Sequence, residues 1–209
     1  MRKARKKRER QVGVSLALES LTSIPAPRVM DFGSGFGFYG FAVLEGHPGA
    51  HVTFADIRED NLKTVARIVR MKGWEKRAHH VVVRDEKAGE LKGPLLLDLI
   101  LAMGVLHHTP YASGIVENLT PLLRGGGIFQ AMLYNRVYQR AMESIAGRSL
   151  DPAGFGAFTD PRAGQLENPY SESYDERKAR ELFKGYEFMD VHRSHPFYDV
   201  YRFRKSGKE

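Results

Sequence analysis

Asp31-Phe32-Gly33-Ser34-Gly35-Phe36-Gly37 is the stretch that decides the fold of this 209-residue chain. It follows the apolar pair Val29-Met30, and the residues from Phe38 to Leu44 that come next are typical of the start of a helix. Glycine at alternate positions lets the backbone adopt positive φ and lets a ligand approach where a Cβ would intrude. The stretch therefore predicts a strand, a turn and a helix, with a pocket for a nucleotide-type cofactor at the turn.

Two classes of cofactor compete for this pocket. The segment Gly35-Phe36-Gly37-Phe38-Tyr39-Gly40 fits the pattern G-x-G-x-x-G, and Asp56 follows Gly35 by 21 positions, near the spacing of the ribose-binding acid in a dinucleotide fold. The pattern alone does not choose between the two. Asp31 does so in part, because a carboxylate at the end of the strand would repel a pyrophosphate but would suit a ligand that carries an ammonium and a sulfonium group.

In the form D-x-G-x-G-x-G, followed by an acid after the next strand, the segment resembles motif I of the class I S-adenosylmethionine-dependent methyltransferases. The resemblance covers roughly residues 28 to 133 and, more loosely, 175 to 205. It implies S-adenosylmethionine as the cofactor. The residues that it implies for cofactor binding are Asp31, Gly33, Gly35 and Gly37 for the methionine and ribose portion, Asp56 and Ile57 for the adenosine, Asp85 and Glu86 for the adenine edge, and Met103 at the end of the fourth strand.

Further segments supply the rest of a sheet. Strands are predicted at residues 51–55, 80–83, 95–103 and 128–133, and the apolar run from Leu95 to Met103 is typical of a strand buried on both faces of a parallel sheet. Residues 187–192 and 198–203 predict a closing hairpin, which the ordinary dinucleotide fold lacks. Helices are predicted over 12–24 and 59–72. Together with the resemblance, these segments predict an α/β fold, a Rossmann-like three-layer sandwich with a seven-stranded, mostly parallel sheet and a C-terminal antiparallel hairpin.

Composition predicts one compact domain over residues 12–209, preceded by a basic tail over 1–11. With 42% hydrophobic residues the chain can bury a core, but it lacks room for the second domain that dehydrogenases usually carry. No apolar run approaches the roughly 18 residues that span a bilayer, and no signal-peptide pattern is present, so we expect a cytoplasmic protein without a membrane span. The chain has no cysteine, which excludes methylation at cytosine C5 by a thiol nucleophile.

The positive charge is concentrated at the N-terminus. Residues 1–10 hold seven of the 32 Lys and Arg residues and one of the 25 acidic residues, so the remainder of the chain is close to neutral. Such a cluster can bind a nucleic acid or an anionic surface. The alternative is a solvated, disordered terminus, because blocks of like charge repel one another.

The loop after the fourth strand is where a catalytic base is expected, since in this architecture it faces the reacting methyl group. It contains His107 and His108, whose ordinary pKa lies near neutrality, so that either is a candidate general base. The alternative is that the pair only lines the pocket wall. Tyr134 is a third candidate for contact with substrate or cofactor, because it lies at the exit of a central strand.

The same loop argues against narrower classes of enzyme. It lacks the Asn/Asp-Pro-Pro-Tyr/Phe cage of adenine and amide methyltransferases, and Met103 stands where metal-dependent catechol-type enzymes place an acid, so no metal is expected. Residues 134–174 predict a substrate lid or insertion with aromatic side chains. These features favour methyl transfer to a small molecule. The alternatives are an RNA or protein methyltransferase that uses the basic tail as an anchor, and a non-catalytic module that binds S-adenosylmethionine; the acceptor atom and the oligomeric state stay open.

Overall fold

The computed structural model describes residues 2–91, 96–159, 169–193 and 195–207. The strands, in chain order, are β1 (Arg28–Phe32), β2 (His51–Asp56), β3 (Ala78–Val82), β4 (Leu97–Met103), β5 (Leu123–Tyr134), β6 (Tyr186–His192) and β7 (Tyr198–Lys205). The helices are α1 (Arg2–Leu21), α2 (Phe38–Gly46), α3 (Glu59–Lys72), α4 (Ala112–Leu119), α5 (Arg136–Ala146), α6 (Pro152–Thr159) and α7 (Glu176–Leu182), with short 3₁₀ turns η1 (Leu106–His108) and η2 (Thr120–Leu122).

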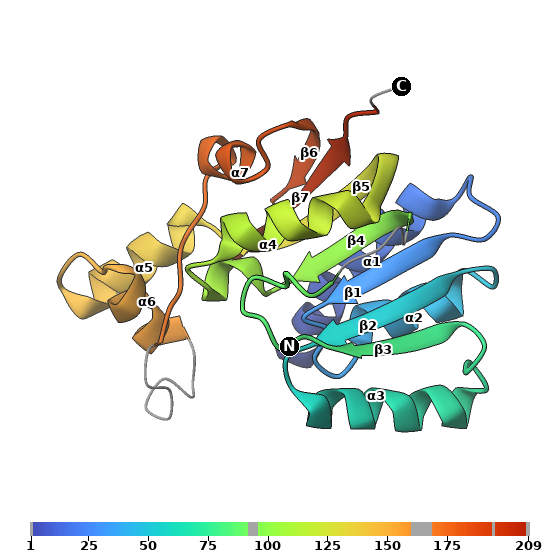
Figure 1. Cartoon of the computed structure of the whole chain (residues 1–209). Coiled ribbons are helices and arrows are strands. Elements are labelled where there is room, and N and C mark those ends of the chain that lie inside the picture. Colours follow the sequence, from blue (N-terminus) through green and yellow to red (C-terminus); the bar gives the residue numbers. More distant parts are fainter. Residues whose placement is uncertain (1, 92–95, 160–168, 194, 208–209) are drawn as a thin grey trace.

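Within the described residues, seven strands form one sheet in the order β3-β2-β1-β4-β5-β7-β6. Strands β1 to β5 are parallel, and β7 runs antiparallel between β5 and β6. Helices lie on both faces of this sheet (Figure 1). The predicted Rossmann-like sandwich with a closing antiparallel hairpin is therefore confirmed, and the switch in strand order between β1 and β4 opens a crevice at the carboxyl ends of these strands.

Alternation along the central strands divides the core into two layers. In β1, Val29 packs into the layer covered by α1, α2 and α3, whereas Met30 packs into the layer with α4 and α7. Successive side chains of a strand point to opposite faces, and a strand buried on both faces is apolar throughout. This alternation matters for the site, because the last residue of each strand faces one particular layer.

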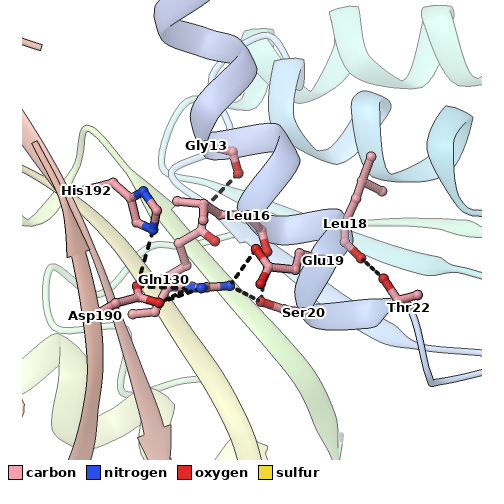
Figure 2. A network of polar contacts seen from close by, with 10 residues as sticks. Gly13, Leu16, Leu18, Glu19, Ser20, Thr22, Gln130, Asp190 and His192 are labelled. Carbon is pink, nitrogen blue, oxygen red and sulfur yellow. Dashed lines mark hydrogen bonds and ion pairs between the residues drawn. The ribbon is translucent and has the colours of Figure 1, made fainter. Parts of the chain in front are cut away.

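The leading helix was expected over residues 12–24, but α1 runs from Arg2 to Leu21, so the basic segment forms its first turns. Polar contacts fasten its second half across the sheet (Figure 2). The Gln130 side chain donates to the Gly13 carbonyl at 2.8 Å. The buried Arg202 guanidinium is held by Asp190 and also pairs with Glu19 of α1 at 3.4 Å. The helix is thereby fixed relative to β5, β6 and β7.

The connection over residues 134–174, expected to be a substrate lid or insertion, contains two helices, α5 and α6; residues 160–168 lie outside the described part. Its aromatic side chains mostly pack on one another. Tyr138 contacts Tyr134 with ring centroids 5.1 Å apart and stacks on Phe197 at 4.4 Å, and Phe155 is buried against both tyrosines. These rings therefore attach the connection to the domain.

No helix in the described residues is both long and apolar enough to cross a membrane.

Candidate active site

A cavity of about 1010 Å³ lies where β1, β2, β3 and β4 end. Its lining takes residues from the loop after each of these strands, including Gly33, Asp56, Asp85 and Gly104. The carboxyl ends of parallel strands meet at one edge of a sheet, and ligands of open α/β folds bind outside that edge at the switch in strand order. The four loops that the sequence singled out therefore converge on one site.

The glycine turn after β1 forms the floor of the cavity. Gly33 and Gly35 have φ of 65° and 53°. A Cβ on Gly33 would lie 2.3 Å from Cγ2 of Val105, in the loop after β4, so only glycine lets these two loops approach. Around Gly35 there is no atom within 4 Å of the position of a Cβ. The turn is thus packed closely at its first glycine and open at its second.

Asp56, at the end of β2, is held by three hydrogen bonds. Its Oδ2 accepts from the backbone N–H of Gly35 at 2.7 Å, and its Oδ1 accepts from the Arg58 N–H at 2.8 Å and the Asn61 side chain at 3.1 Å. The carboxylate therefore links the glycine turn to the start of α3. A carboxylate has about four acceptor positions, so one remains for a hydroxyl group in the cavity.

The next three residues predicted to bind the cofactor, Ile57, Asp85 and Glu86, are also on the cavity wall. Ile57 is 63% exposed although it is apolar, and it lines the cavity together with Asp85 and Glu86. The Asp85 carboxylate accepts from the backbone N–H groups of Lys87 and Gly89 at 2.9 and 2.8 Å. These hydrogen bonds lower the pKa of Asp85, so it is an anion at neutral pH.

Asp31 does not line the cavity, contrary to the expectation that it contacts the ligand. Its side chain points into the layer under α2, where Oδ2 accepts from the Gly40 N–H at 2.9 Å. Burial raises the pKa of Asp31 to about 7, although the hydrogen bond from Gly40 opposes this effect. Gly40 is needed at this point, because a Cβ there would lie 2.3 Å from Phe54. Asp31 therefore supports the turn from below.

Met103 and Gly37 likewise do not line the cavity. Met103 faces the α1 layer, where its sulfur lies 3.7 Å from the amide nitrogen of Gln130, because alternation along β4 turns its side chain away from the cavity. Gly37 precedes α2 with φ of 80°, and its Cβ position is 2.9 Å from the ring of Phe41. The sequence located both residues at the correct strand ends but did not determine which face they would meet.

The other half of the cavity follows β4. Its lining includes His108, Pro110, Tyr111, Ile115 and Tyr170. Of these residue types, only histidine can carry a charge near neutral pH. Tyr170 comes from the connection that precedes α7, and burial with the nearby Glu172 raises its pKa to about 12, so its hydroxyl stays protonated. This half therefore offers apolar surface with a few neutral polar groups.

Of the three catalytic candidates, only His108 lines the cavity. His107 is buried, its Nδ1 donates to the Met132 carbonyl at 3.2 Å, and desolvation together with His108 holds its pKa well below the usual value. Tyr134 stacks against His107, with ring centroids 3.9 Å apart. Because neither of these two lines the cavity, His107 and Tyr134 form the support behind His108.

Several lining residues were missed by sequence reasoning. Asn61 and Thr64 lie one helical turn apart on α3, so the position of Asp56 before this helix was a usable signal for them. Phe36 lies inside the glycine motif and is 68% exposed, which is unusual for phenylalanine. Tyr170 belongs to the aromatic side chains of the 134–174 connection that were expected to face a substrate, but only the tertiary fold shows that this one, and not its aromatic neighbours, lines the cavity.

The cavity fits the cofactor that the resemblance implies. It is long enough to run from the loop after β3 to the loop after β4, and it combines an acid at the end of β2 with an exposed apolar side chain beside it. The buried hydroxyl of Ser34, in the glycine turn, has no hydrogen-bond partner in the described structure. An orphaned buried hydroxyl in a turn of this kind fits a polar ligand that completes its hydrogen bonding.

Comparisons with known proteins agree with this geometry. Residues 30–129 match the family model of a methyltransferase domain. The chain is 35% identical over 129 residues to the ribosomal RNA small subunit methyltransferase G of Synechococcus sp. (strain WH7803), a match that covers 60% of this chain and 46% of that protein. The chain thus spans about half of the length of this curated relative.

Solved structures show the same fold at low sequence identity. The [4+2]-cyclase SpnF is similar with a TM-score of 0.70 and 15% identity, over 93% of this chain and 80% of SpnF. The magnesium protoporphyrin IX methyltransferase of Synechocystis PCC 6803, solved with bound SAH, has a TM-score of 0.69 and 15% identity, over 95% of this chain and 84% of that chain. Identities of this size indicate a common fold and leave the reaction to be argued from the site.

Proposed function

We propose that the chain is a class I S-adenosylmethionine-dependent methyltransferase and that it transfers a methyl group from this cofactor to an uncharged small molecule. The observation that carries the proposal is the division of one cavity into an acidic half over β2 and β3 and a neutral, partly aromatic half after β4. The first half suits the cofactor and the second suits the acceptor.

The cofactor half supplies binding and orientation. The residues that would hold S-adenosylmethionine are Gly33, Gly35 and Ser34 in the turn, Asp56 for the ribose hydroxyls, and Ile57, Asp85 and Glu86 around the adenine. When bound, the cofactor supplies a methyl group attached to a positively charged sulfur. The sulfur is the leaving group and keeps the electron pair of the C–S bond. The protein therefore has to align the acceptor and exclude water.

The acceptor half narrows the class of substrate. Pro110, Tyr111 and Ile115 provide apolar contact, and no Lys or Arg side chain is found among the described residues that line the cavity after β4. This composition favours an uncharged molecule with a ring or similar apolar surface. His108 is then the general base, since it is the titratable group of this half whose ordinary pKa is near neutrality; it takes the proton of a hydroxyl or amine as the acceptor atom attacks.

Calorimetry and labelled methyl transfer test the proposal. The full chain should bind S-adenosylmethionine and S-adenosylhomocysteine but not NAD, and it should transfer labelled methyl to uncharged phenols or hydroxylated rings in a substrate panel. His108→Gln should lower kcat by about 10²- to 10⁴-fold, the usual contribution of a general base, with cofactor affinity unchanged. NAD binding without the other two would overturn the cofactor assignment, and transfer only to RNA would overturn the acceptor class.

RNA is the second candidate acceptor, and the placement of α1 favours it. Gly13 lies beside Met103, the last residue of β4, and the residues of α1 before Gly13 extend from there for about 16 Å along the helix axis. Figure 1 places the start of the chain at the edge of the sheet on which the cavity opens. The basic segment would thus lie near an RNA presented to the cavity. Against this stand Asp60, Asp85 and Glu86 on the cavity wall, which would repel phosphates.

Salt dependence separates the two acceptors. If RNA is the acceptor, its affinity for the full chain should fall steeply with salt. The logarithm of the binding constant should fall with the logarithm of the salt concentration with a slope of up to about five, for seven neutralised phosphates on single-stranded RNA. Removal of residues 2–10 should abolish both binding and transfer to RNA. If the acceptor is a small molecule, the same truncation should leave kcat and KM unchanged.

A further inference from the structure

His108 is connected to two hydroxyl side chains behind the cavity wall. Its Nδ1 lies 3.0 Å from Oγ of Ser171 and 3.4 Å from the backbone carbonyl of Tyr170. The Ser171 hydroxyl, which is fully buried, lies 2.7 Å from Oγ1 of Thr159 at the end of α6. The Thr159 hydroxyl in turn donates to the Gly156 carbonyl at 3.4 Å. The chain of contacts therefore begins on the imidazole and ends on a backbone oxygen.

The Gly156 and Tyr170 carbonyls require the same donor-to-acceptor direction along this series of hydrogen bonds. A carbonyl oxygen can only accept, so the Thr159 proton points to Gly156, and the Thr159 oxygen is left to accept from Ser171. The Ser171 oxygen then accepts from Nδ1 of His108. The Tyr170 carbonyl independently requires a proton on the same nitrogen. The four contacts named above are all satisfied only when His108 carries its hydrogen on Nδ1, which puts the lone pair on Nε2.

We propose that Thr159 and Ser171 are positioning residues that hold His108 in the Nδ1–H tautomer, so that Nε2 receives the acceptor's proton. This inference rests on the proposed function for the role of His108 in methyl transfer. A neutral imidazole has one donor and one acceptor nitrogen, and the hydrogen bond at one nitrogen decides which role the other takes. The Thr159 hydroxyl, which is two hydrogen bonds away from His108, therefore decides which imidazole nitrogen can accept a proton.

The backbone around the two hydroxyls is fixed well enough to set this direction. The Ser171 N–H donates to the Pro152 carbonyl at 2.9 Å, and the Glu172 N–H donates to the His107 carbonyl at 2.9 Å. Gly156 packs directly on the chain beside Tyr170, since a Cβ there would lie 2.7 Å from the Tyr170 nitrogen. The start of α6, the stretch after residue 169 and the loop after β4 are thus held together by backbone contacts.

Nuclear magnetic resonance of the full chain tests the tautomer without any substrate. Two-bond ¹⁵N–¹H correlation spectra at a pH where histidine is neutral distinguish the two tautomers, and the signal missing from His108→Gln identifies the residue among the eight histidines. The wild type should show a proton on Nδ1. Thr159→Val removes the acceptor for the Ser171 proton, so this proton should turn to Nδ1 and shift His108 to the Nε2–H tautomer. Thr159→Ser keeps the hydroxyl and should keep the wild-type spectrum.

Ser171→Ala should have a smaller effect than Thr159→Val. In this variant the Nδ1 proton still has the Tyr170 carbonyl as an acceptor, and no hydroxyl is present to drive the opposite tautomer. A wild-type tautomer in Thr159→Val would overturn the proposal, as would an Nε2–H signal in the wild type. Matched circular dichroism spectra of the three variants and the wild type establish that the fold is retained.

Kinetics separate this inference from the function on which it rests. With an acceptor found by the labelled-methyl screen, Thr159→Val should lower kcat about tenfold or more with KM unchanged, and Thr159→Ser should restore the rate. If the tautomer changes but kcat does not, the positioning role stands and His108 is not the base. If the tautomer does not change, the positioning role is overturned whatever the rate.

Discussion

The two halves of the cavity are built in different ways. In the cofactor half, most of these hydrogen bonds come from neighbours close in sequence, as when Asp56 accepts from Arg58 and Asn61, or Asp85 accepts from Lys87 and Gly89, and the bond from Gly35 to Asp56 spans only 21 positions. In the acceptor half, His108 is held by Ser171, 63 positions away. The cofactor half therefore depends on local loops at strand ends, and the acceptor half depends on how a long connection folds back.

Each half also rests on a buried ionisable residue whose neutral form is favoured by burial. Asp31 lies beneath the glycine turn with a raised pKa, and His107 lies beneath His108 with a lowered pKa. In both cases burial is the main cause, because it disfavours the charged form. The comparison indicates that the cavity places its charges on the wall and excludes them from the layer behind it.

The largest expected effect concerns Asp31 and the pH dependence of stability. Its folded pKa of about 7 lies above the ordinary value of 3.8, so between these values the folded state binds a proton that the unfolded state has lost. Stability should therefore fall as pH rises from about 4 to 7 and level off above that, by about 1.4 kcal/mol per unit of pKa shift. Denaturant unfolding of the wild type and Asp31→Asn at several pH values should show this slope only in the wild type.

Asp56 tests the dependence of the cofactor half on local polar contacts. Asp56→Ala should weaken S-adenosylmethionine binding at least tenfold, since a buried charged acceptor contributes about 1.5 to 3 kcal/mol. The matched control is Asp60→Ala, at the same rim but with a side chain that is 87% exposed, which should change affinity less than twofold. Equal losses in the two variants, measured by calorimetry, would contradict the assignment of Asp56 to the ribose.

Gly156 tests the dependence of the acceptor half on long-range packing. Gly156→Ala places a methyl group 2.7 Å from a backbone nitrogen, so the segment at Tyr170 has to move. We expect kcat/KM to fall about tenfold with cofactor affinity unchanged, about 1.4 kcal/mol in transition-state binding. Gly154→Ala on the same helix meets the side chains of Asp151 at 2.9 Å and Leu150 at 3.4 Å but no backbone atom, and it should be close to wild type. A loss of cofactor affinity in Gly156→Ala would show that the halves are not separable.

Ile57 has the smallest expected effect. Ile57→Ala removes apolar surface from the cavity wall and should weaken cofactor binding about three- to fivefold, or about 1 kcal/mol, if the side chain is covered by the adenine. Met71 is a still more exposed apolar residue, on α3 and outside the cavity lining, so Met71→Ala should have no effect. An unchanged affinity in Ile57→Ala would place the adenine elsewhere along the wall.

Most of the fold could be predicted because the signals are local. Alternating glycines, apolar runs and helical spacing, together with the family resemblance, predicted the seven-stranded, mostly parallel sheet, and most of the cofactor residues proposed after β1, β2 and β3 line the cavity. Asp31 and Met103 were located at the correct edge but on the wrong side of the sheet. One residue of register changes the face, and the sequence pattern of a strand buried on both sides does not reveal it.

The sequence by itself determined that this chain forms a parallel sheet with a glycine turn and an acid at the end of the next strand, because backbone conformation and burial depend on residues only a few positions apart. Only the tertiary structure decided which of the two adjacent histidines lines the cavity, and that Thr159 and Ser171 lie behind it. Those choices depend on where residues 152–159 and 169–174 pack against the loop after β4. No local pattern encodes a contact between segments more than sixty positions apart.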